Sequence, residues 1–437
     1  MLSLRLKSRS DCSGRALAML GLAAWLSACS AREVGQPPAP GATAERGAAQ
    51  PAPAATAAAP NGFVYSDGEQ LKDGAGEPLT LRGVNLGGWL LWEGWIWGGG
   101  FQSESTLQER LEALAGREAT ADFRAQVYAS FITEADIARI AELGFNVVRL
   151  PFHHQLLEDE GDRYVYKASG WEVLDRALDW CAAHDVYVVL TLHAAPGGQS
   201  AMFTADPQGP ERLWASEAYQ ARTVALWKAI AERYRDRAII AGYDLLNEPV
   251  PPAADDLIAL YADLIAAIRS VDPNHLIIVE GAGYARDFSI FAGPLTHNQA
   301  YSFHMYTWFG DNRKDELEKY REVSSRHNLP MWNGEFGENS YERLESTVAL
   351  FQDPAYGLAG WAFWTWKKAP NRYPYLLGIR TTDRWDAVMR WIEQPNWPNP
   401  QPTQAEALQG MDDFLAAIRF ENNVENPEMI ALLSQGR

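Results

Sequence analysis

The stretch IIAGYDLLNEP, from Ile239 to Pro249, combines a nearly continuous apolar run with a carboxylate and a proline at its end. Such a run is typical of a strand that is covered on both faces, as in a parallel sheet. Pro249 has no N–H to donate to a sheet ladder, so we expect the strand to stop there and to leave Asn247 and Glu248 at its carboxyl end. Because an unpaired buried charge is costly, a glutamate at this point indicates a function.

A second apolar run ends on a carboxylate in the same way. It is PMWNGEFG, from Pro330 to Gly337, in which glycines flank Glu335. Two carboxylates at the ends of two buried strands predict work as acid and nucleophile. Their separation along the chain does not tell how far apart they lie in space.

Short apolar runs rich in β-branched and aromatic residues alternate with helical patterns from Gly62 onward. Eight such runs predict strands: Leu81 to Leu86, Asn146 to Phe152, Tyr187 to His193, Ile239 to Glu248, Leu276 to Ala282, Ala300 to Tyr306, Met331 to Gly337 and Ala359 to Trp366. Eight β/α repeats predict an α/β fold of the (β/α)8 TIM-barrel type. A doubly wound open sheet is the alternative, which the lack of a glycine-rich phosphate turn after the first strand disfavours.

Amphipathic segments between these runs predict the outer helices. They are Glu134 to Leu143, Gly170 to His184, Ser216 to Arg235, Ala254 to Val271, Lys314 to Asn328, Tyr341 to Phe351 and Thr403 to Arg419. The link from Arg286 to Thr296 is short and only weakly helical. Asp67-Gly68 and Lys72-Asp73-Gly74 predict hairpin turns that close the bottom of the barrel.

An insertion from Gly87 to Thr133 follows the first predicted strand. It begins GGWLLWEGWIWGGGF, and this density of Trp and Gly favours a cleft wall over a core segment. The chain has 17 tryptophans, and those not needed in the core can serve flat apolar surfaces such as sugar rings.

The N-terminal residues have the pattern of a secretory signal. Basic residues precede the apolar stretch from Ala16 to Leu26, and Leu26-Ser27-Ala28-Cys29 resembles a bacterial lipobox. We therefore expect a lipoprotein signal peptide over residues 1–28, a lipid on Cys29, a disordered Ala/Pro-rich tether over residues 29–61 and a catalytic domain over residues 62–437. The alternative is an ordinary signal peptide in which the cysteine is coincidental.

The formal net charge of −18 argues against nucleic acid and anionic lipid surfaces as partners and is compatible with neutral substrates. The three cysteines do not form a disulfide framework, because Cys12 leaves with the signal and Cys29 carries the lipid. Cys181 lies in an amphipathic stretch and is predicted to be a buried thiol.

Polar and aromatic residues stand at the ends of nearly all the predicted strands, where barrels of this type carry their chemistry. Alone, each has a structural explanation: an arginine can pair with a structural acid, and a histidine or tryptophan can belong to the core. Their joint placement favours a site. The candidates are Glu93, Arg149, His193, Asn247, Glu248, His304, Tyr306, Glu335, Trp364 and Trp366.

The pattern of these candidates favours cleavage of a glycosidic bond. The histidines lie on separate strands without metal-ligand spacing such as HExxH, and no GxSxG turn is present. Cleaving an acetal needs one carboxylic acid to protonate the leaving oxygen and one carboxylate to attack or to activate water. Whether configuration is retained or inverted stays open at this point.

The chain resembles glycoside hydrolase family 5, and within it the exo-β-1,3-glucanase-like branch. The motifs that carry the resemblance are LRGVNLGGW, NVVRLPF, LHAAPGGQ, LLNEP, SFHMY, NGEFG and FWTWK, and they extend from about Gly62 to beyond the eighth strand. NEP paired with GEFG is the most specific of them.

The resemblance implies Glu248 as general acid/base and Glu335 as nucleophile, hence retention. It also implies that Arg149 and Tyr306 hold Glu335 ionised and that Asn247 binds the sugar 2-hydroxyl. The resemblance further implies a subsite for the attacked sugar that is lined by Glu93, His193 and His304, with Trp364 under the ring.

We therefore expect a retaining, monomeric hydrolase that acts on neutral β-glucan without cofactor or metal. Its lipid would be its only link to a membrane, after export across the inner membrane, with the domain facing the periplasm or the exterior. The alternatives are an endo-β-1,4-glucanase, mannanase or transglycosylase of the same family, or a surface carbohydrate-binding protein without catalysis.

Overall fold

The computed structural model describes residues 62–161, 163–308, 313–371, 373–395 and 400–434. The predicted signal peptide, the lipid site at Cys29 and the tether lie outside the described residues. Within them, no helix combines the length and the apolar character that crossing a bilayer requires.

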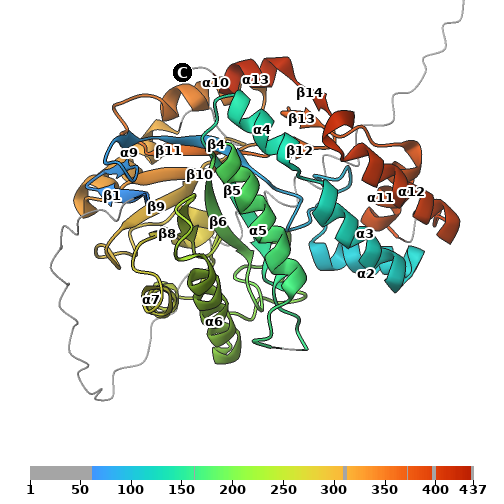
Figure 1. The fold of residues 1–437 in the computed structure, drawn as a ribbon, viewed down its shortest axis with the longest axis horizontal. Helices are drawn as coiled ribbons and strands as arrows, with labels where there is room; N and C mark the ends of the chain where they lie inside the picture. The colour runs from blue at the N-terminus through green and yellow to red at the C-terminus, as the bar shows by residue number, and fades with distance from the viewer. Residues whose placement is uncertain (1–61, 162, 309–312, 372, 396–399, 435–437) are drawn as a thin grey trace, which may run out of the picture. The chain divides into compact units, whose positions relative to one another are not determined.

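Eight parallel strands close into a barrel, as the sequence predicts (Figure 1). Around the barrel their order is β10-β11-β4-β5-β6-β7-β8-β9, so strands neighbouring in sequence are also neighbours in space. Their bounds are β4 (Leu81–Asn85), β5 (Val147–His153), β6 (Tyr187–Ala194), β7 (Ile240–Asp244), β8 (Leu276–Glu280), β9 (Gln299–His304), β10 (Met331–Gly337) and β11 (Gly360–Trp364).

The prediction that β7 runs to Glu248 was wrong. Regular pairing ends at Asp244, and the next residues follow the barrel edge by bonding to different neighbours. The Leu245 N–H donates to the Ile278 carbonyl at 3.1 Å, and the Asn247 N–H donates to the Leu192 carbonyl at 3.0 Å. Alternating between two adjacent strands breaks the ladder, so the NEP motif lies on a hydrogen-bonded loop.

Helices cover the outside of the barrel where the sequence predicts them. They are α4 (Glu134–Glu142), α5 (Ala168–Ala183), α6 (Glu217–Tyr234), α7 (Ala254–Arg269), α9 (Lys314–His327) and α10 (Tyr341–Phe351). The weak unit between β8 and β9 contains only the short α8 (Ala282–Ala285). Cys181 lies in α5 as a buried free thiol, also as predicted.

Side chains inside the barrel change from apolar to polar along strands such as β5 and β8. Because alternate residues face the same side, Val147 and Arg149 both point inward from β5, as do Leu276, Ile278 and Glu280 from β8. Val147, Leu276 and Ile278 belong to one buried apolar cluster at the amino end of the strands. The strand pattern therefore places the polar layer at the carboxyl end.

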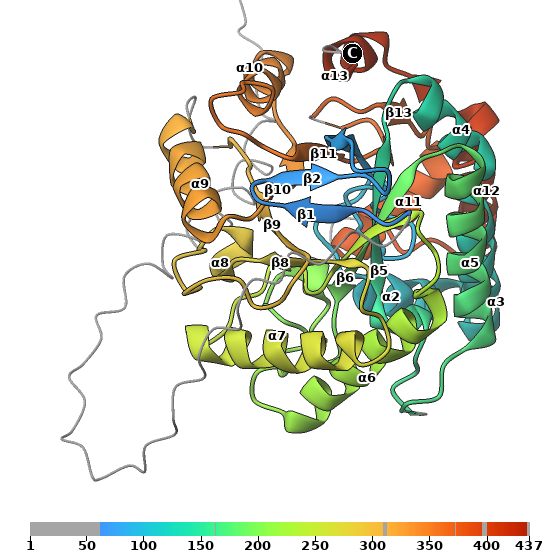
Figure 2. The same cartoon turned by 60° about the vertical axis from the view of Figure 1, so that its left-hand side comes forward.

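A small antiparallel sheet covers the bottom of the barrel (Figure 2). It comprises β1 (Tyr65–Asp67), β2 (Gln70–Lys72) and β3 (Pro78–Leu79). Leu71 packs into the same apolar cluster as the bottom of the barrel. The two predicted hairpin turns are thus confirmed.

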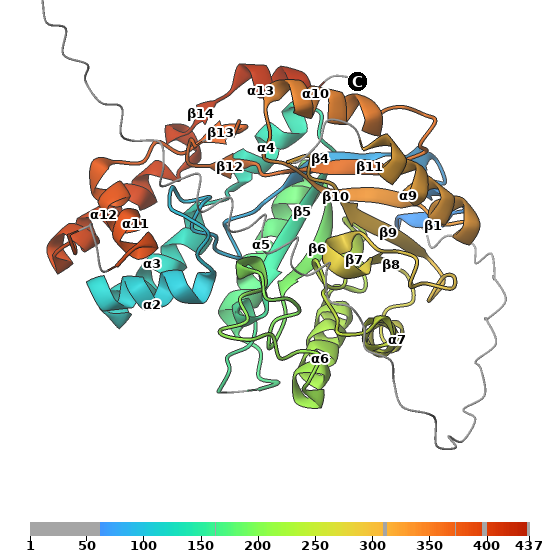
Figure 3. The same cartoon turned by 180° about the vertical axis from the view of Figure 1, so that it is seen from behind.

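The insertion after β4 is not mainly a cleft wall, and this expectation was wrong. It contains α2 (Glu104–Ala115) and α3 (Arg117–Ser130), which lie beside α11 (Asp383–Glu393) and α12 (Gln404–Ala417) in Figures 1 and 3. Trp92 and Trp97 are fully buried, and Trp97 packs on Phe414 with ring centroids 5.0 Å apart. Gly88 and Gly98, which flank these tryptophans, have positive φ and turn the chain into a core that it shares with the C-terminal helices.

Short elements complete the described chain. They are η1 (His154–Leu156), η2 (Phe203–Ala205), β12 (Lys367–Lys368), β13 (Leu377–Gly378), η3 (Phe420–Asn422), β14 (Val424–Glu425) and α13 (Pro427–Leu433).

Gly83 in β4 tests how tightly the barrel closes. A Cβ added there would lie 1.7 Å from the Val147 carbonyl oxygen, so Gly83→Ala must push two backbones apart. We expect a loss of about 3 kcal/mol or more in the free energy of unfolding, measured by urea denaturation. Gly293→Ala is the matched control, because an added Cβ meets nothing within 4 Å. Equal stability of the two variants would contradict this packing.

Candidate active site at the carboxyl end of the barrel

Arg149 stands at the centre of the polar layer and is fully buried. Its Nε donates to Asp244 at 3.0 Å, and its Nη1 donates to Asn85 at 3.1 Å and Glu335 at 2.5 Å. Its Nη2 donates to Asn247 at 2.8 Å and Glu280 at 3.1 Å. All five N–H groups of the guanidinium are therefore used, and one cation faces three carboxylates.

Glu335 points inward because β10 is irregular just before it. Pairing with β9 shifts register between Asn333 and Glu335, and the Gly334 carbonyl accepts a hydrogen bond from Asn85 at 3.0 Å. A bulge of this kind re-aims the side chain that follows it. The two Glu335 oxygens then meet Arg149 on one side and the Tyr306 hydroxyl, at 2.9 Å, on the other.

Glu248 is held by its backbone. Its φ of 47° lies in the left-handed region that residues other than glycine seldom adopt. The Glu248 N–H donates to Oε2 of Glu280 at 2.6 Å, and Gln199 donates to the Asn247 carbonyl at 2.8 Å. These bonds stabilise the strained conformation and aim the Glu248 side chain at the barrel axis.

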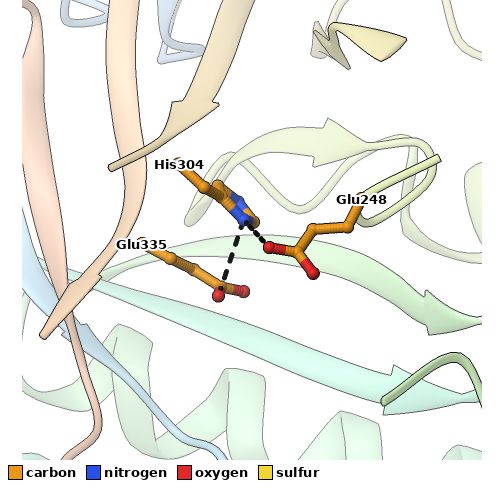
Figure 4. Close-up of side chains that lie close together, drawn as sticks. All are labelled: Glu248, His304 and Glu335. Atoms are coloured by element: carbon orange, nitrogen blue, oxygen red, sulfur yellow. Dashed lines mark hydrogen bonds and ion pairs between the residues drawn. The ribbon is translucent and has the colours of Figure 1, made fainter. Parts of the chain in front are cut away.

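His304 lies between the two candidate catalytic carboxylates (Figure 4). Its Nδ1 is 2.9 Å from Glu248 and 3.5 Å from Glu335, while its Nε2 is 3.2 Å from Glu280. Burial alone would lower the pKa of His304, but Glu280, Glu335 and Glu248 together raise it well above its ordinary value. The surrounding carboxylates thus favour the charged form of the ring.

The atoms of Glu248, His304 and Glu335 lie within 4.8 Å of one another, a spacing that could hold a metal ion. A protonated imidazole has no free lone pair for a metal, because both its nitrogens carry hydrogen. Both ring nitrogens of His304 lie close to carboxylates, as expected for the protonated form. The donor set therefore favours a network of charged hydrogen bonds over a metal centre.

Opposing influences set the ionisation of Glu335. Burial raises the pKa of its carboxyl, and the nearby Glu248 adds to this. The charges of His304 and Arg149 and the hydrogen bond from Tyr306 lower the pKa again. Burial outweighs these groups, so the pKa of Glu335 stays above its ordinary value, and His304, Arg149 and Tyr306 limit the rise.

The other predicted residues are also buried at the carboxyl end of the barrel. Trp364 and His193 stack with ring centroids 5.3 Å apart, and burial lowers the pKa of His193 well below its usual value. Glu93 accepts a hydrogen bond from Trp95 at 2.7 Å. Among the described residues, Nδ1 of His193 and Oε1 of Glu93 are buried without a hydrogen-bond partner. Buried polar atoms normally have a partner, so these two atoms are candidates for contact with a ligand.

One predicted candidate does not belong to this site. Trp366 points away from it and donates to Asp136 in α4 at 2.9 Å, and Lys367 next to it lies 2.8 Å from the same carboxylate. Both residues join the barrel to its helical cover.

The sequence reasoning missed Asn85, Asp244 and Glu280, which hold Arg149. Glu280 ends the apolar run LIIVE as Glu248 and Glu335 end theirs, so the same signal could have found it. Asp244 and Asn85 offered a weaker signal, because a polar residue inside an apolar strand run has no distinct spacing.

Comparisons with known proteins bear on this arrangement. The family described as Cellulase (glycosyl hydrolase family 5) matches residues 112–370. A protein named Beta-xylosidase from Phanerodontia chrysosporium is 38% identical over 63% of this chain and 61% of its own length. A Probable glucan 1,3-beta-glucosidase A from Aspergillus clavatus is 34% identical over 44% of this chain and 48% of its own. Endoglucanase C from Acetivibrio thermocellus is 32% identical over 43% of this chain and 54% of its own length.

The alignments thus span about half to three fifths of these relatives' lengths. Among solved structures, rutinosidase from Aspergillus niger has a TM-score of 0.55 at 20% identity, covering 67% of this chain and 91% of its own. An endogalactoceramidase has a TM-score of 0.54 at 20% identity, and the match covers 70% of this chain and 75% of the endogalactoceramidase chain. At these identities the structures show a shared fold.

Tyr306→Phe tests how the Glu335 charge is held. Removing the hydroxyl deletes a hydrogen bond to the ionised form, so the pKa of Glu335 should rise. NMR titration of 13C-labelled glutamate carboxyls measures this, with Glu335 assigned by the signal lost in Glu335→Gln. Tyr320→Phe is the control, since it removes a hydroxyl that donates to Glu316 in α9, away from Glu335. An unchanged or lowered Glu335 pKa in Tyr306→Phe would refute this role.

Proposed function

The chain belongs to glycosyl hydrolase family 5, and from this membership we propose that it is a retaining glycoside hydrolase that cleaves β-glucosidic bonds of β-glucan. The observation that carries the proposal is the spacing of the two carboxylates. One oxygen of Glu248 and one of Glu335 lie within 4.8 Å of each other. Retaining glycosidases have their carboxyl groups about 5 to 5.5 Å apart, whereas inverting ones need about 6.5 to 9.5 Å to admit a water.

In the first step Glu335 attacks the anomeric carbon and forms a covalent glycosyl ester, while Glu248 gives its proton to the departing oxygen. Arg149 and Tyr306 both bind the attacking carboxylate and fix its orientation. Holding the nucleophile in place lowers the entropic part of the barrier. The contact with His304 Nδ1 at 2.9 Å likewise positions the Glu248 carboxyl.

In the second step Glu248 takes a proton from water, which attacks the anomeric carbon and releases Glu335. The same residue thus acts first as acid and then as base. When Glu335 becomes an ester it loses its charge, so one carboxylate disappears from around His304 and Arg149. The second step needs Glu248 as a carboxylate, because only that form can accept the proton from water.

The proposed substrate is a neutral β-glucan or its oligosaccharides, attacked from chain ends in the manner of an exo-β-1,3-glucanase or β-glucosidase. The net charge of −18 disfavours acidic polymers, and one relative is named a glucan 1,3-beta-glucosidase. A second candidate is endo-acting cleavage of β-1,4-glucan, which the relative named Endoglucanase C favours.

Product analysis separates these two candidates. Laminarin, carboxymethyl cellulose, mannan and xyloglucan would be incubated with the protein and the products separated by chromatography. Glucose alone from laminarin is expected, because an exo-acting enzyme releases single terminal residues. A ladder of oligosaccharides from cellulose would contradict exo cleavage and support the second candidate.

Exchanging each carboxylate for alanine tests the two roles. Glu248→Ala should lower turnover of natural glucans by about 10² to 10⁴. An aryl glycoside whose leaving group needs no proton should still form the ester, which then hydrolyses slowly. Added azide needs no general base, so it should restore turnover and give a β-glycosyl azide. Product configuration is read by NMR.

Glu335→Ala is the matched partner of that experiment, because it removes the nucleophile from the same site. It cannot form the ester, so any azide product should be the α anomer, from direct attack in the vacated space. Exchanged results for the two variants would reverse the roles. Unchanged turnover in either variant would show that this glutamate takes no part in the mechanism. If the wild-type protein cleaves none of these glycans, a carbohydrate-binding protein without catalysis would be favoured.

A further inference from the structure

Glu338 and Lys368 carry opposite charges that interact with each other, and Glu338 also interacts electrostatically with Glu335. Glu338 directly follows β10 and has a φ of 51°, which turns its side chain out of the regular strand direction. Lys368 is buried, and its Nζ donates to Asn371 at 2.7 Å and to the Tyr373 carbonyl at 3.1 Å. Neither residue takes part in the proton transfers described above.

Aromatic contacts connect this pair to the site from two directions. Nζ of Lys368 lies 5.2 Å from the centre of the Trp95 ring, and Trp95 donates to Glu93. On the other side, a hydrogen bond from Trp308 lowers the pKa of Glu338, and Trp308 stacks on Tyr306 with centroids 4.6 Å apart. The pair is therefore built into the wall that also holds Glu335.

The barrel order decides which part of a substrate meets this wall. Glu338, Lys368 and Glu93 follow β10, β11 and β4, which are consecutive in the barrel, whereas Glu248 follows β7 across from them. The leaving group must lie beside its proton donor, Glu248. The sugar that stays on the nucleophile, the glycone, then extends toward the Glu338–Lys368 wall.

The wall lacks some of the partners that its polar groups need. Oε1 of Glu93 is buried and, in the described part of the chain, accepts no hydrogen bond. Burial raises the pKa of Glu338 to about 7, although Lys368 opposes this, and burial lowers the pKa of Lys368 to about 8. The buried Oε1 of Glu93 thus needs a donor, and sugar hydroxyl groups can both donate to a carboxylate and accept from the Lys368 ammonium.

We propose that Glu338 and Lys368, beside Glu93, bind the glycone hydroxyls farthest from the scissile bond: the 4-hydroxyl and the 6-hydroxymethyl group of a non-reducing terminal hexose. This inference rests on the proposed function and adds the residues that select the terminal sugar. A site built to hydrogen-bond a hydroxyl rejects an analogue without it, because its buried polar groups are then left unpaired. Binding a free 4-hydroxyl also selects a chain end over an internal 1,4-linked residue.

The test compares aryl β-glucoside with its 4-deoxy analogue and with aryl β-xyloside, which lacks the hydroxymethyl group. In wild type we expect kcat/KM for the glucoside to exceed that for at least one analogue by about 10². Glu338→Gln and Lys368→Met should each lower this preference at least tenfold, mainly through slower cleavage of the glucoside. The analogue that lacks the recognised hydroxyl should be cleaved about as fast as by wild type.

Lys367→Met is the matched control, since Lys367 is an equally buried neighbour that pairs with Asp136 outside the site. It should lower the melting temperature and leave the preference unchanged. Equal losses on all three substrates in Glu338→Gln and Lys368→Met, or no loss at all, would overturn the inference. If the wild-type protein cleaves no aryl glycoside, the proposed function itself is refuted. Failure of the inference can thus be distinguished from failure of the proposed function.

Discussion

The ion cluster around the fully buried Arg149 is the constraint on which the site depends. Three carboxylates, from β7, β8 and β10, converge on one guanidinium that also binds two amides. Removing one partner from a buried ion pair typically costs about 3 to 5 kcal/mol, because the other charge is left uncompensated. The barrel can therefore close in this register only with these strand ends correctly placed, and folding itself positions Glu335.

The same cluster connects the two carboxylates that the mechanism uses. Glu280 accepts from Arg149 with one oxygen and from the Glu248 backbone with the other, while His304 contacts Glu280, Glu248 and Glu335. A change of charge on Glu335 is thus felt at Glu248 through a continuous network. Charges interact more strongly in a low-dielectric interior than in water. Such an interaction suits the proposed reaction, in which Glu248 acts as an acid in one step and as a base in the other.

Around this centre the carboxyl end of the barrel has two sides, to which we assign different tasks. The side of β7 carries the proposed proton donor on a loop that backbone hydrogen bonds hold, whereas Glu93, Glu338 and Lys368 lie on the side of β10, β11 and β4. Relatives of this chain bear names for xylosidase, glucosidase and endoglucanase activities. A barrel that fixes its central cluster and varies its loops can serve several substrates, because loops tolerate change that the packed strands do not.

The sequence by itself determined the strands and most of the helices, because buried parallel strands and amphipathic helices leave local patterns that a single chain shows. It also marked Glu248 and Glu335, since a charge that ends an apolar run stands out. It did not show that β7 stops at Asp244, that Asp244 and Glu280 share Arg149, or that Trp92 and Trp97 join a core with α11 and α12. Those features depend on the closure of the barrel and on contacts between residues far apart in the chain. Only the tertiary structure brings the two carboxylates within 4.8 Å and sets Lys368 beside Trp95, because distance across a barrel is decided by how all eight strands pair.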